Sequence, residues 1–466
     1  MLRGHILKLT VFSLAAFILL GGCRKREGFS LADNYIVFTS NAQGISEAET
    51  SITIKLKLVR GVDNDIPVVI KITEQGAAYG VKYTTIPAAT AGTINLTAPS
   101  GNNEASFTIN KVPGVLFDGT EKLVFDLYSS GSPLLIGTTK QLTLSFAELV
   151  ATNSTAVLNG GGPTYPNKVF IDLSANRQTA VLRTNWDLGF YTDASDFKVI
   201  LNSSNGMTAK QITKNDLTQV TATDTVGFFD AMGSLFGSPA QLPLVDYPSG
   251  DMSKTAIGLI AATAADNKVF IIYRGKGVGS PLPERGWKKI RVLRNASGGY
   301  TLQHADIAST TFTSIDIPKD DKYFFKYISF ETGAVTVEPE KTKWDIAWTH
   351  STYVSGSGAS EFPFLFQDVV FQNRNVQVAK MLTSSKAYAD FAEADIAGQT
   401  FTFLQTAIGS DWRSGGGPSS GPAVKTTQYY IIKDGNNNYY KLKFTAVADG
   451  GIRGNPSIEY ALVKRG

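Results

Sequence analysis

Lys322-Tyr-Phe-Phe-Lys-Tyr-Ile-Ser-Phe-Glu-Thr-Gly-Ala-Val, residues 322–335, is followed by Lys343-Trp-Asp-Ile-Ala-Trp-Thr, residues 343–349. An earlier stretch repeats this pattern, with Lys168-Val-Phe-Ile-Asp-Leu-Ser-Ala-Asn and then Asn185-Trp-Asp-Leu-Gly-Phe-Tyr-Thr. Both stretches run from strand-like apolar residues through a short polar turn to Trp-Asp and further alternating apolar residues. Trp344 lies 158 positions after Trp186, which indicates that one unit occurs twice in the chain.

The length and composition indicate an ordered, mostly β protein of several domains. At 466 residues the chain is too long for one hydrophobic core. Charged residues make up 18%, aromatic residues 11%, and there are 44 Gly, a balance that suits antiparallel sheets with many turns. The net charge of +4 comes without a long Lys/Arg run, so we expect no nucleic-acid partner.

Residues 1–22 have the features of an export signal. A basic start precedes an apolar run that is shorter than the roughly 20 residues of a spanning helix and ends in small residues. Leu20-Gly-Gly-Cys23 resembles the bacterial lipobox, which implies a signal peptide over 1–22 and acylation of Cys23. The implied protein is an outer-membrane lipoprotein, held by lipid through Cys23 and facing the periplasm or the cell surface. The alternative is an ordinary signal peptide with an incidental Cys.

Residues 34–149 show short runs of alternating apolar residues between Gly, Asn, Asp and Pro, which predicts a β-sandwich. The passages that begin at Gly44, Ala105 and Phe117 resemble the Calx-β family of sandwich domains. Some members of that family bind calcium, and the nearest carboxylates here are Glu47, Asp118, Glu121 and Asp126. Because calcium takes roughly six to eight oxygen ligands, we expect solvated charges on a spacer domain rather than a calcium site.

The rest of the chain divides into a linker and the two copies of the repeated unit. Residues 151–166 are rich in Gly, Pro and Asn, as linkers are. The first copy covers 167–315 and the second 320–466, so we expect an all-β chain with a sandwich and two tandem antiparallel units. Trp186 to Ile271 spans 85 residues and Trp344 to Ile431 spans 87, so the late strands keep their spacing. Residues 384–395 have near-helical apolar spacing and predict a short helix.

Three passages of the second copy resemble the HmuY family of haem-binding lipoproteins. They are the strand and turn at 323–335, the Trp-Asp passage at 343–350, and the hairpin at 429–444 with Asp434-Gly435 in its turn. The likeness covers most of 320–466 and, more weakly, 167–315. It implies an all-β fold that captures haem or a related tetrapyrrole at the bacterial surface for iron acquisition, beside an outer-membrane receptor.

The resemblance also implies axial haem ligands, His or Met, between Trp-Asp and the last hairpin. In the second copy that interval contains His350 and Met381, and the first copy offers His304 beyond its hairpin. Those three residues are the candidate haem ligands. The first copy also contains Met207, Met232 and Met252, which have no recognisable ligand context. Residues 412–422, where the family can hold a ligand, contain neither His nor Met.

The sequence offers little for catalysis, and we expect no enzyme and no resident metal site. The chain has three His and a single Cys, and it lacks the metalloprotease, nucleophile-elbow and phosphate-binding motifs. Asp187 and Asp345 occur once in each copy. We therefore expect each Asp to cap a repeated turn while the neighbouring Trp fills a repeated core.

A second hypothesis is a non-catalytic cell-surface module that binds a polysaccharide or a protein partner. Four tyrosines bracket the last predicted turn, and flat aromatic rings suit contacts with sugars and proteins. They are Tyr429, Tyr430, Tyr439 and Tyr440. The competing interpretation is a strand pair that packs two of these rings on each face.

Overall fold

The computed structural model describes residues 33–45, 49–115, 117, 120–146, 153–228, 237–415 and 421–466. The chain divides into a unit of residues 1–34 and a unit of residues 35–466, and the sheets lie in the second unit. Within the described ranges, no helix is both long enough and apolar enough to cross a bilayer.

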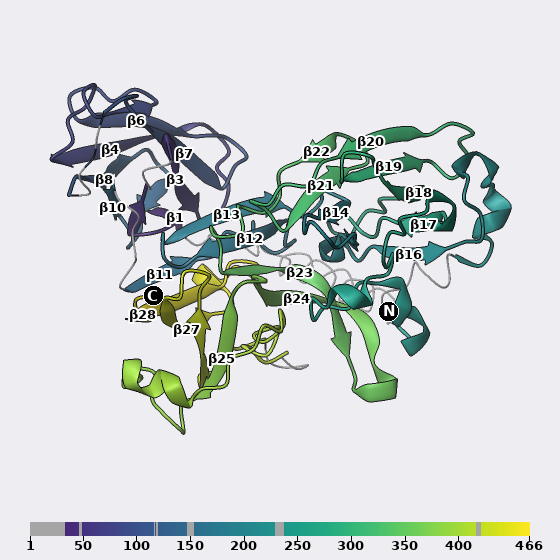
Figure 1. Ribbon diagram of the computed structural model, residues 1–466. Coiled ribbons are helices and arrows are strands. Elements are labelled where there is room, and N and C mark those ends of the chain that lie inside the picture. Colours follow the sequence, from purple (N-terminus) through teal and green to yellow (C-terminus); the bar gives the residue numbers. More distant parts are fainter. Residues whose placement is uncertain are drawn as a thin grey trace, which may run out of the picture. The chain divides into compact units, whose positions relative to one another are not determined.

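The first ten strands form two antiparallel-rich sheets, as the alternating sequence predicts (Figure 1). Their orders are β5-β7-β3-β1-β9 and β2-β10-β8-β4-β6. Apolar residues at every second position, such as Ile54 and Leu56, are fully buried and fill one core. The strands are β1 (Asn34–Phe38), β2 (Ala42–Gly44), β3 (Ser51–Leu58), β4 (Ile66–Gln75), β5 (Tyr83–Ile86), β6 (Thr93–Ala98), β7 (Glu104–Lys111), β8 (Lys122–Ser130), β9 (Leu134–Ile136) and β10 (Gln141–Ser145).

Within the described residues, each copy of the repeat, taken together with the strand that precedes it, supplies nine strands in the same order. The first copy gives β11 (Asn153–Val157), β12 (Asn167–Asp172), β13 (Arg177–Leu182), β14 (Leu188–Tyr191), β15 (Val199–Leu201), β16 (Thr208–Gln211), β17 (Phe270–Tyr273), β18 (Trp287–Arg294) and β19 (Tyr300–Ala305). The second gives β20 (Thr313–Ile317), β21 (Phe325–Ser329), β22 (Gly333–Val335), β23 (Ile346–Ser355), β24 (Phe362–Gln372), β25 (Gln377–Leu382), β26 (Gln428–Lys433), β27 (Tyr439–Ala446) and β28 (Ser457–Lys464). The all-β class is confirmed.

The sheets combine strands from both copies rather than following the repeats. Sheet β13-β12-β23-β24 joins the first hairpin of copy one to the second hairpin of copy two, and sheet β15-β14-β21-β22 does the reverse. Figure 1 shows β12 beside β23, where Val169 pairs with Trp348. The outer sheets repeat the exchange, with orders β11-β28-β27-β26-β25 and β16-β17-β18-β19-β20.

The exchange creates two structural halves with separate cores. The continuous half consists of β14–β22, and its core includes Leu188, Val292 and Phe330. The split half consists of β11–β13 with β23–β28, and its core includes Val169 and Trp348. A further apolar cluster, containing Trp186 and Trp344, combines residues of both halves.

The helical segments that the structure describes in full are short and of the 3-10 type. The segments are η1 (Ser203–Asn205), η2 (Leu217–Gln219), η3 (Ala222–Thr225), η4 (Pro239–Leu244), η5 (Met252–Lys254), η6 (Ala264–Asp266), η7 (Gly358–Ser360), η8 (Glu393–Gly398) and η9 (Asp449–Gly451). The helix predicted over 384–395 is wrong in its position, because only η8 is helical there. Lys441 Nζ donates hydrogen bonds to the backbone carbonyl oxygens of Tyr388, Ala389 and Phe391. A longer helix would need these carbonyl groups as acceptors for its own backbone N–H groups.

Candidate ligand-binding cavity

Each Trp-Asp pair is fixed by a turn that belongs to the other copy. The backbone N–H of Phe330 donates to Asp187 Oδ2 at 2.9 Å, and that of Leu173 donates to Asp345 Oδ2 at 2.8 Å. Phe330 and Leu173 follow β21 and β12, the first hairpin strands of the opposite copies. The capping role predicted for both Asp residues is confirmed, and it links the copies.

An Asn amide fixes each Trp in an equivalent way. Asn202 Nδ2 donates to the Trp186 carbonyl and Asn373 Nδ2 donates to the Trp344 carbonyl, both at 2.8 Å. Asn202 directly follows β15 and Asn373 directly follows β24, so the two positions correspond in the repeat. The backbones of both Trp residues are therefore held by matching contacts.

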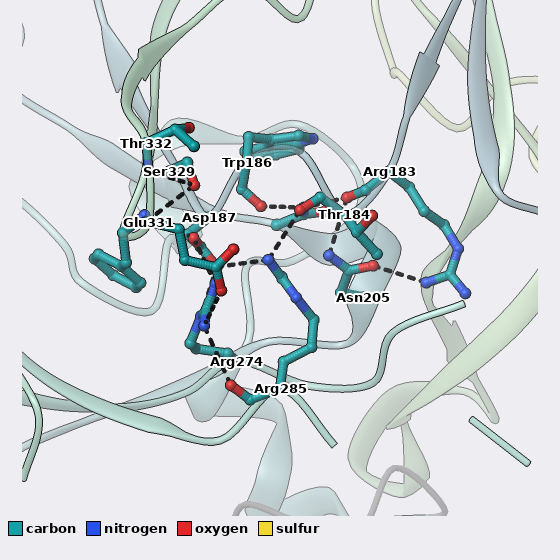
Figure 2. A network of polar contacts seen from close by, with 12 residues as sticks. Arg183, Thr184, Trp186, Asp187, Asn205, Arg274, Arg285, Ser329, Glu331 and Thr332 are labelled. Atoms are coloured by element: carbon teal, nitrogen blue, oxygen red, sulfur yellow. Dashed lines mark hydrogen bonds and ion pairs between the residues drawn. The ribbon is translucent and has the colours of Figure 1, made fainter. Parts of the chain in front are cut away.

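Asp187 lies within a cluster of cations, which Figure 2 shows from close by. Arg274 donates to both Asp187 oxygens, at 2.9 and 3.0 Å, and Arg285 approaches at 3.2 Å. Glu331 accepts a further hydrogen bond from Arg274 at 2.9 Å. Because Asp187 is fully buried, these cations supply the compensation that a buried carboxylate requires.

Asp345 lies among other carboxylates instead. Burial and then the charges of Asp172 and Asp434 raise the pKa of Asp345 well above its usual range. Asp434 directly follows β26 just as Arg274 directly follows β17. The second copy therefore places a carboxylate where the first copy places an arginine.

A cavity of about 110 Å³ lies where the two halves meet. Its apolar walls contain the Trp of each copy and further rings. They are Trp186, Trp344, Phe324, Phe325, Tyr327 and Phe371. Corresponding positions of the two copies face it with different residues, because Ser203 follows Asn202 whereas Arg374 follows Asn373.

Two carboxyl groups of the cavity have both oxygens occupied by donors. Glu338 accepts hydrogen bonds from Phe325 N at 2.7 Å and from the Tyr327 hydroxyl at 3.1 Å. Asp246 accepts from Leu201 N at 2.6 Å and Ala256 N at 2.9 Å. Burial raises the pKa of Glu338 and the pKa of Asp246 to about 7.

Two cations line the same cavity. Burial lowers the pKa of Lys168 to about 8, and the nearby Glu338 opposes this shift. Lys168 Nζ lies 5.0 Å from the centre of the Phe170 ring. Arg374 donates to the Gly250 carbonyl at 2.9 Å and stacks over Phe325 at 5.1 Å, but its Nε has no partner.

The indole N–H groups of Trp186 and Trp344 are also without partners. Both side chains are buried, at 3% and 5% exposure, and neither Nε1 forms a hydrogen bond. In Figure 2 the indole of Trp186 extends away from the Asp187 cluster. Both Nε1 atoms have almost no solvent-accessible area, so they lie inside the packed wall of the cavity.

A wider groove of about 540 Å³ adjoins the cavity. It shares Tyr247, Gly250, Asp251, Arg374 and Gln405 with the cavity lining. Phe403 and Leu404 add exposed apolar surface, at 57% and 46% exposure. This volume falls within the roughly 300–1,000 Å³ of typical small-molecule sites.

The three candidate haem ligands lie on three different sheets. His350 on β23 packs near the Tyr165 ring, and burial lowers its pKa to about 3. His304 on β19 packs near Phe330, and Met381 on β25 lies in a core with Tyr429. Neither the cavity lining nor the groove lining includes any of the three.

These residues do not fit a haem held between two axial side chains. Met207 is buried in the core of the continuous half, whereas Met252 lines the cavity and brings one thioether to it. The described cavity lining offers aromatic rings that could contact a flat macrocycle, but it contains no His for an iron. Cys23 and Met232 lie outside the described residues.

The carboxylates considered for calcium have structural partners where they are described. Glu121 is buried and pairs with Lys82, and Asp126 accepts a hydrogen bond from Gln141 at 2.8 Å. Glu47 and Asp118 lie outside the described residues. Among the residues that the structure places, no three His, Cys, Asp or Glu side chains are grouped as metal ligands.

The tyrosines of the last hairpin do not form an exposed aromatic surface. Tyr429, Tyr430 and Tyr440 are at most 1% exposed. Tyr430 and Tyr440 belong to the core of the split half, whereas Tyr429 and Tyr439 pack on the other face with Met381. The interpretation of two rings on each face is confirmed, and Tyr439 alone among the four is partly exposed.

Sequence reasoning missed the charged residues of the cavity. Lys168, Asp246, Glu338 and Arg374 come from widely separated segments, and no spacing connects them. The only local signal is a single charged residue beside a strand-like apolar run, as at Lys168.

The fold and cavity define an all-β protein with a candidate ligand site enclosed by two related halves. The family model described as "HmuY protein" matches residues 164–311 and 321–460, which is more than half of the chain. The chain belongs to the HmuY family. No curated protein matches the sequence.

The solved structures that match cover different parts of the chain. The Calx CBD1 domain in its apo form is 15% identical, covers 25% of this chain and 96% of its own, and has a TM-score of 0.21. A protein from Bacteroides vulgatus described as HmuY-like and heme-binding is 10% identical, covers 67% and 93%, and has a TM-score of 0.17. A protein from Bacteroides ovatus described as carbohydrate-binding is 12% identical, covers 92% and 98%, and has a TM-score of 0.18.

Proposed function

We propose that this chain is a non-catalytic HmuY-type lipoprotein that captures haem or a related tetrapyrrole in the groove and cavity. The observation that carries the proposal is the continuity of a groove of about 540 Å³ with an aromatic cavity, in a chain of this family. The role we propose is iron or haem acquisition, with delivery to an outer-membrane receptor.

The groove supplies surface for a flat ring, and its rim supplies positive charge. Phe403 and Leu404 expose apolar area that a macrocycle would cover. Lys254 Nζ lies 4.9 Å from the Tyr247 ring centre, and Arg374 lines the same groove. Ring contacts and charge therefore hold the ligand in this proposal, and Met252 is the one His or Met side chain among the described residues that line the cavity and the groove.

The buried acids have a structural part in this proposal. Both oxygens of Glu338 and both oxygens of Asp246 already accept hydrogen bonds from the protein. The two carboxyl groups therefore act as anchors for the loops around the cavity.

A titration of the protein lacking residues 1–23 with haem and with metal-free protoporphyrin IX tests the binding proposal. Both ligands are expected to saturate at one equivalent with affinities within about tenfold of each other, since ring and acid contacts dominate. His350→Ala, His304→Ala and Met381→Ala are expected to leave the haem spectrum unchanged. Non-saturating absorbance with both porphyrins would exclude tetrapyrrole capture.

The membrane anchor is a separate part of the proposal. We expect palmitate labelling of the full chain in bacterial cells and recovery in the outer-membrane fraction. Cys23→Ala is expected to abolish both, because one acyl-bearing residue provides the attachment. Labelling that survives this substitution would exclude Cys23 as the site.

The cavity also favours a second candidate, a module that binds a glycan. Indole rings suit contact with the apolar faces of sugar rings, and both Trp residues line the cavity here. A glycan array probed with the full mature chain separates the candidates. Glycan binding that Trp344→Phe weakens, together with absent porphyrin binding, would support this second function.

A further inference from the structure

The first turn of the repeat contacts the N-terminal sandwich through Asn176. This residue is buried, and its φ of +49° lies in the left-handed region that favours glycine. Its amide nitrogen donates to the Ser40 hydroxyl at 3.0 Å and to the Ala42 carbonyl at 2.6 Å, both in the sandwich. Its amide oxygen accepts from the hydroxyls of Ser154 at 2.9 Å and Tyr460 at 2.7 Å. One side chain therefore joins the sandwich to the first and last strands of the split half.

Arg177 continues this contact along the edge of a sandwich sheet. Its guanidinium donates to the Gly44 carbonyl at 2.8 Å and pairs with Glu49. Ala42 and Gly44 belong to β2, which is the outermost strand of its sheet. An edge strand has carbonyl groups without a strand partner, and here side-chain donors of the repeat supply hydrogen bonds to them. The donors of the turn and the acceptors of the sandwich are therefore complementary.

Two further contacts lie away from this turn. Asn159, in the segment between β11 and β12, donates to Glu104 Oε2 of the sandwich at 2.6 Å. Lys57 on β3 is buried, and burial lowers its pKa to about 8 while the charge of Asp449 opposes this shift. The interface therefore includes the linker, the first turn and the segment before the last strand. A spacer on a flexible tether needs none of these contacts.

The corresponding turn of the second copy lacks the donors. Four residues, 173–176, lie between the paired ends of β12 and β13, whereas three residues, 330–332, lie between those of β21 and β22. The second copy therefore has no counterpart of Asn176, and Gly333 stands where the first copy has Arg177. Both donors that reach β2 are features of the first copy.

The outer strands β11 and β20 show the same difference between the halves. Ser154 and Ser314 are the second residues of these two strands, which occupy corresponding places in their sheets. Ser154 is buried and also donates to Asn41 of the sandwich at 3.3 Å, whereas Ser314 is exposed. The same residue type is thus covered in one half and open in the other.

We propose that the turn at 173–177 is a docking surface for the N-terminal sandwich, and that the docked sandwich is a fixed part of the split half, which it stabilises, rather than a spacer on a flexible linker. The strands of the sandwich end at Ser145, so they precede β11–β13 in the chain. The sandwich is therefore the neighbour that these early strands can contact before β23–β28 follow. The docking does not depend on the ligand of the cavity.

Urea unfolding of the protein lacking residues 1–23 tests the docking, because tryptophan fluorescence reports the repeat alone. All five tryptophans lie between residues 186 and 412, and the sandwich contains none. Ile54→Ala removes a fully buried side chain from the sandwich core and weakens the sandwich. A docked sandwich unfolds together with the repeat, so the tryptophan transition is expected to move to lower urea by about 0.5–1 M. Ile54→Val provides a smaller shift of the same sign if Ile54→Ala does not fold.

The double variant Asn176→Gly, Arg177→Ala removes the donors and keeps the left-handed backbone. In this background Ile54→Ala is expected to leave the tryptophan transition in place, because the sandwich then unfolds independently. Ser314→Ala is the matched control in the continuous half. In its background the shift caused by Ile54→Ala is expected to be unchanged.

Circular dichroism, which reports the sandwich as well as the repeat, separates the outcomes. If Ile54→Ala advances the loss of circular dichroism in the otherwise unaltered chain but leaves the tryptophan transition in place, the sandwich is a tethered spacer and the docking is overturned. If the tryptophan shift persists in the double variant, the assignment of the docking surface to this turn is overturned. Loss of the shift in the double variant and its retention with Ser314→Ala would support both parts.

Discussion

The two copies place the same Trp-Asp pair in opposite electrostatic surroundings. Asp187 is paired with Arg274 and Arg285, whereas Asp345 has Asp172 and Asp434 as its charged neighbours. The contacts that both copies share are directed at the backbone, from an N–H to each Asp and from an Asn to each Trp carbonyl. The repeat thus preserves the contacts that shape the chain and varies the charges around them.

The largest change in the free energy of unfolding is expected from Asp187→Asn in the first copy. Asp187→Asn leaves Arg274 and Arg285 buried without their main anion, which should lower the free energy of unfolding by about 3–5 kcal/mol. Urea denaturation provides the measurement. A loss below about 1 kcal/mol would show that the cations do not depend on Asp187.

The next largest difference in unfolding free energy is expected between the glycines that follow Arg274 and Asp434. Gly275 has φ +71°, and a Cβ there would come within 1.9 Å of the Asn205 carbonyl oxygen. Gly275→Ala is therefore expected to cost about 2–3 kcal/mol of unfolding free energy. Gly435 follows Asp434, and its added Cβ would meet only the end of the Asn375 side chain. Gly435→Ala should cost less than about 1 kcal/mol, and equal losses in urea denaturation would contradict the contrast.

Asp345→Asn should raise the free energy of unfolding, whereas Asp187→Asn should lower it. The raised pKa of Asp345 means that the folded protein binds a proton more tightly than the unfolded chain does. Stability from this group is therefore lost as pH rises from about 4 through the raised pKa. Asn keeps an acceptor for Leu173 N and cannot ionise, so it should raise the unfolding free energy at pH 8 by on the order of 1 kcal/mol.

The matched measurement for Asp345→Asn is the same variant at pH 5, where the gain should be smaller. A constant gain at both pH values would remove ionisation as the cause. Asp187→Asn at both pH values serves as the control, because its destabilisation comes from unpaired arginines that stay charged.

The smallest effect is expected from a charge pair outside both clusters. Lys322 and Glu340 are 3.8 Å apart with side-chain exposures of 67% and 42%. Lys322→Ala should change the unfolding free energy by less than about 0.5 kcal/mol, because exposed pairs contribute little. A larger loss of unfolding free energy would mean that exposed charges also contribute to the stability differences between the two copies.

The fold class and the capping roles could be predicted because their signals are local. The strand-like apolar residues at 169–171 and 324–328 indicate strands, and the recurrence of Trp-Asp indicates two caps. The exchange between copies could not be predicted. Val169 pairs with Trp348 of the other copy. Strands with similar apolar patterns contain no sequence feature that specifies which strand they pair with.

The candidate site was predictable only in its tryptophans. Trp186 and Trp344 stand out as repeated core residues, but their shared cavity depends on the exchange. His350 and Met381 were candidate ligands only because of their position along the chain. The strands that carry them direct both side chains into the protein interior. Glu338 and Asp246 have buried carboxyl groups whose donors come from distant backbone positions, which no sequence spacing reveals.

The exchange of strands also determines which half of the molecule can fold first while the chain is being synthesised. All pairings of β14–β22 lie within residues 188–335, so this half can close as soon as it is made. Ser154 on β11 pairs with Tyr460 on β28, so the earliest strands wait for the last ones. Pairings of such high contact order form slowly, and until then β11 and β12 have open edges that can aggregate. A nascent chain that has reached residue 335 therefore contains all strands of the continuous half, whereas the split half still lacks β23–β28.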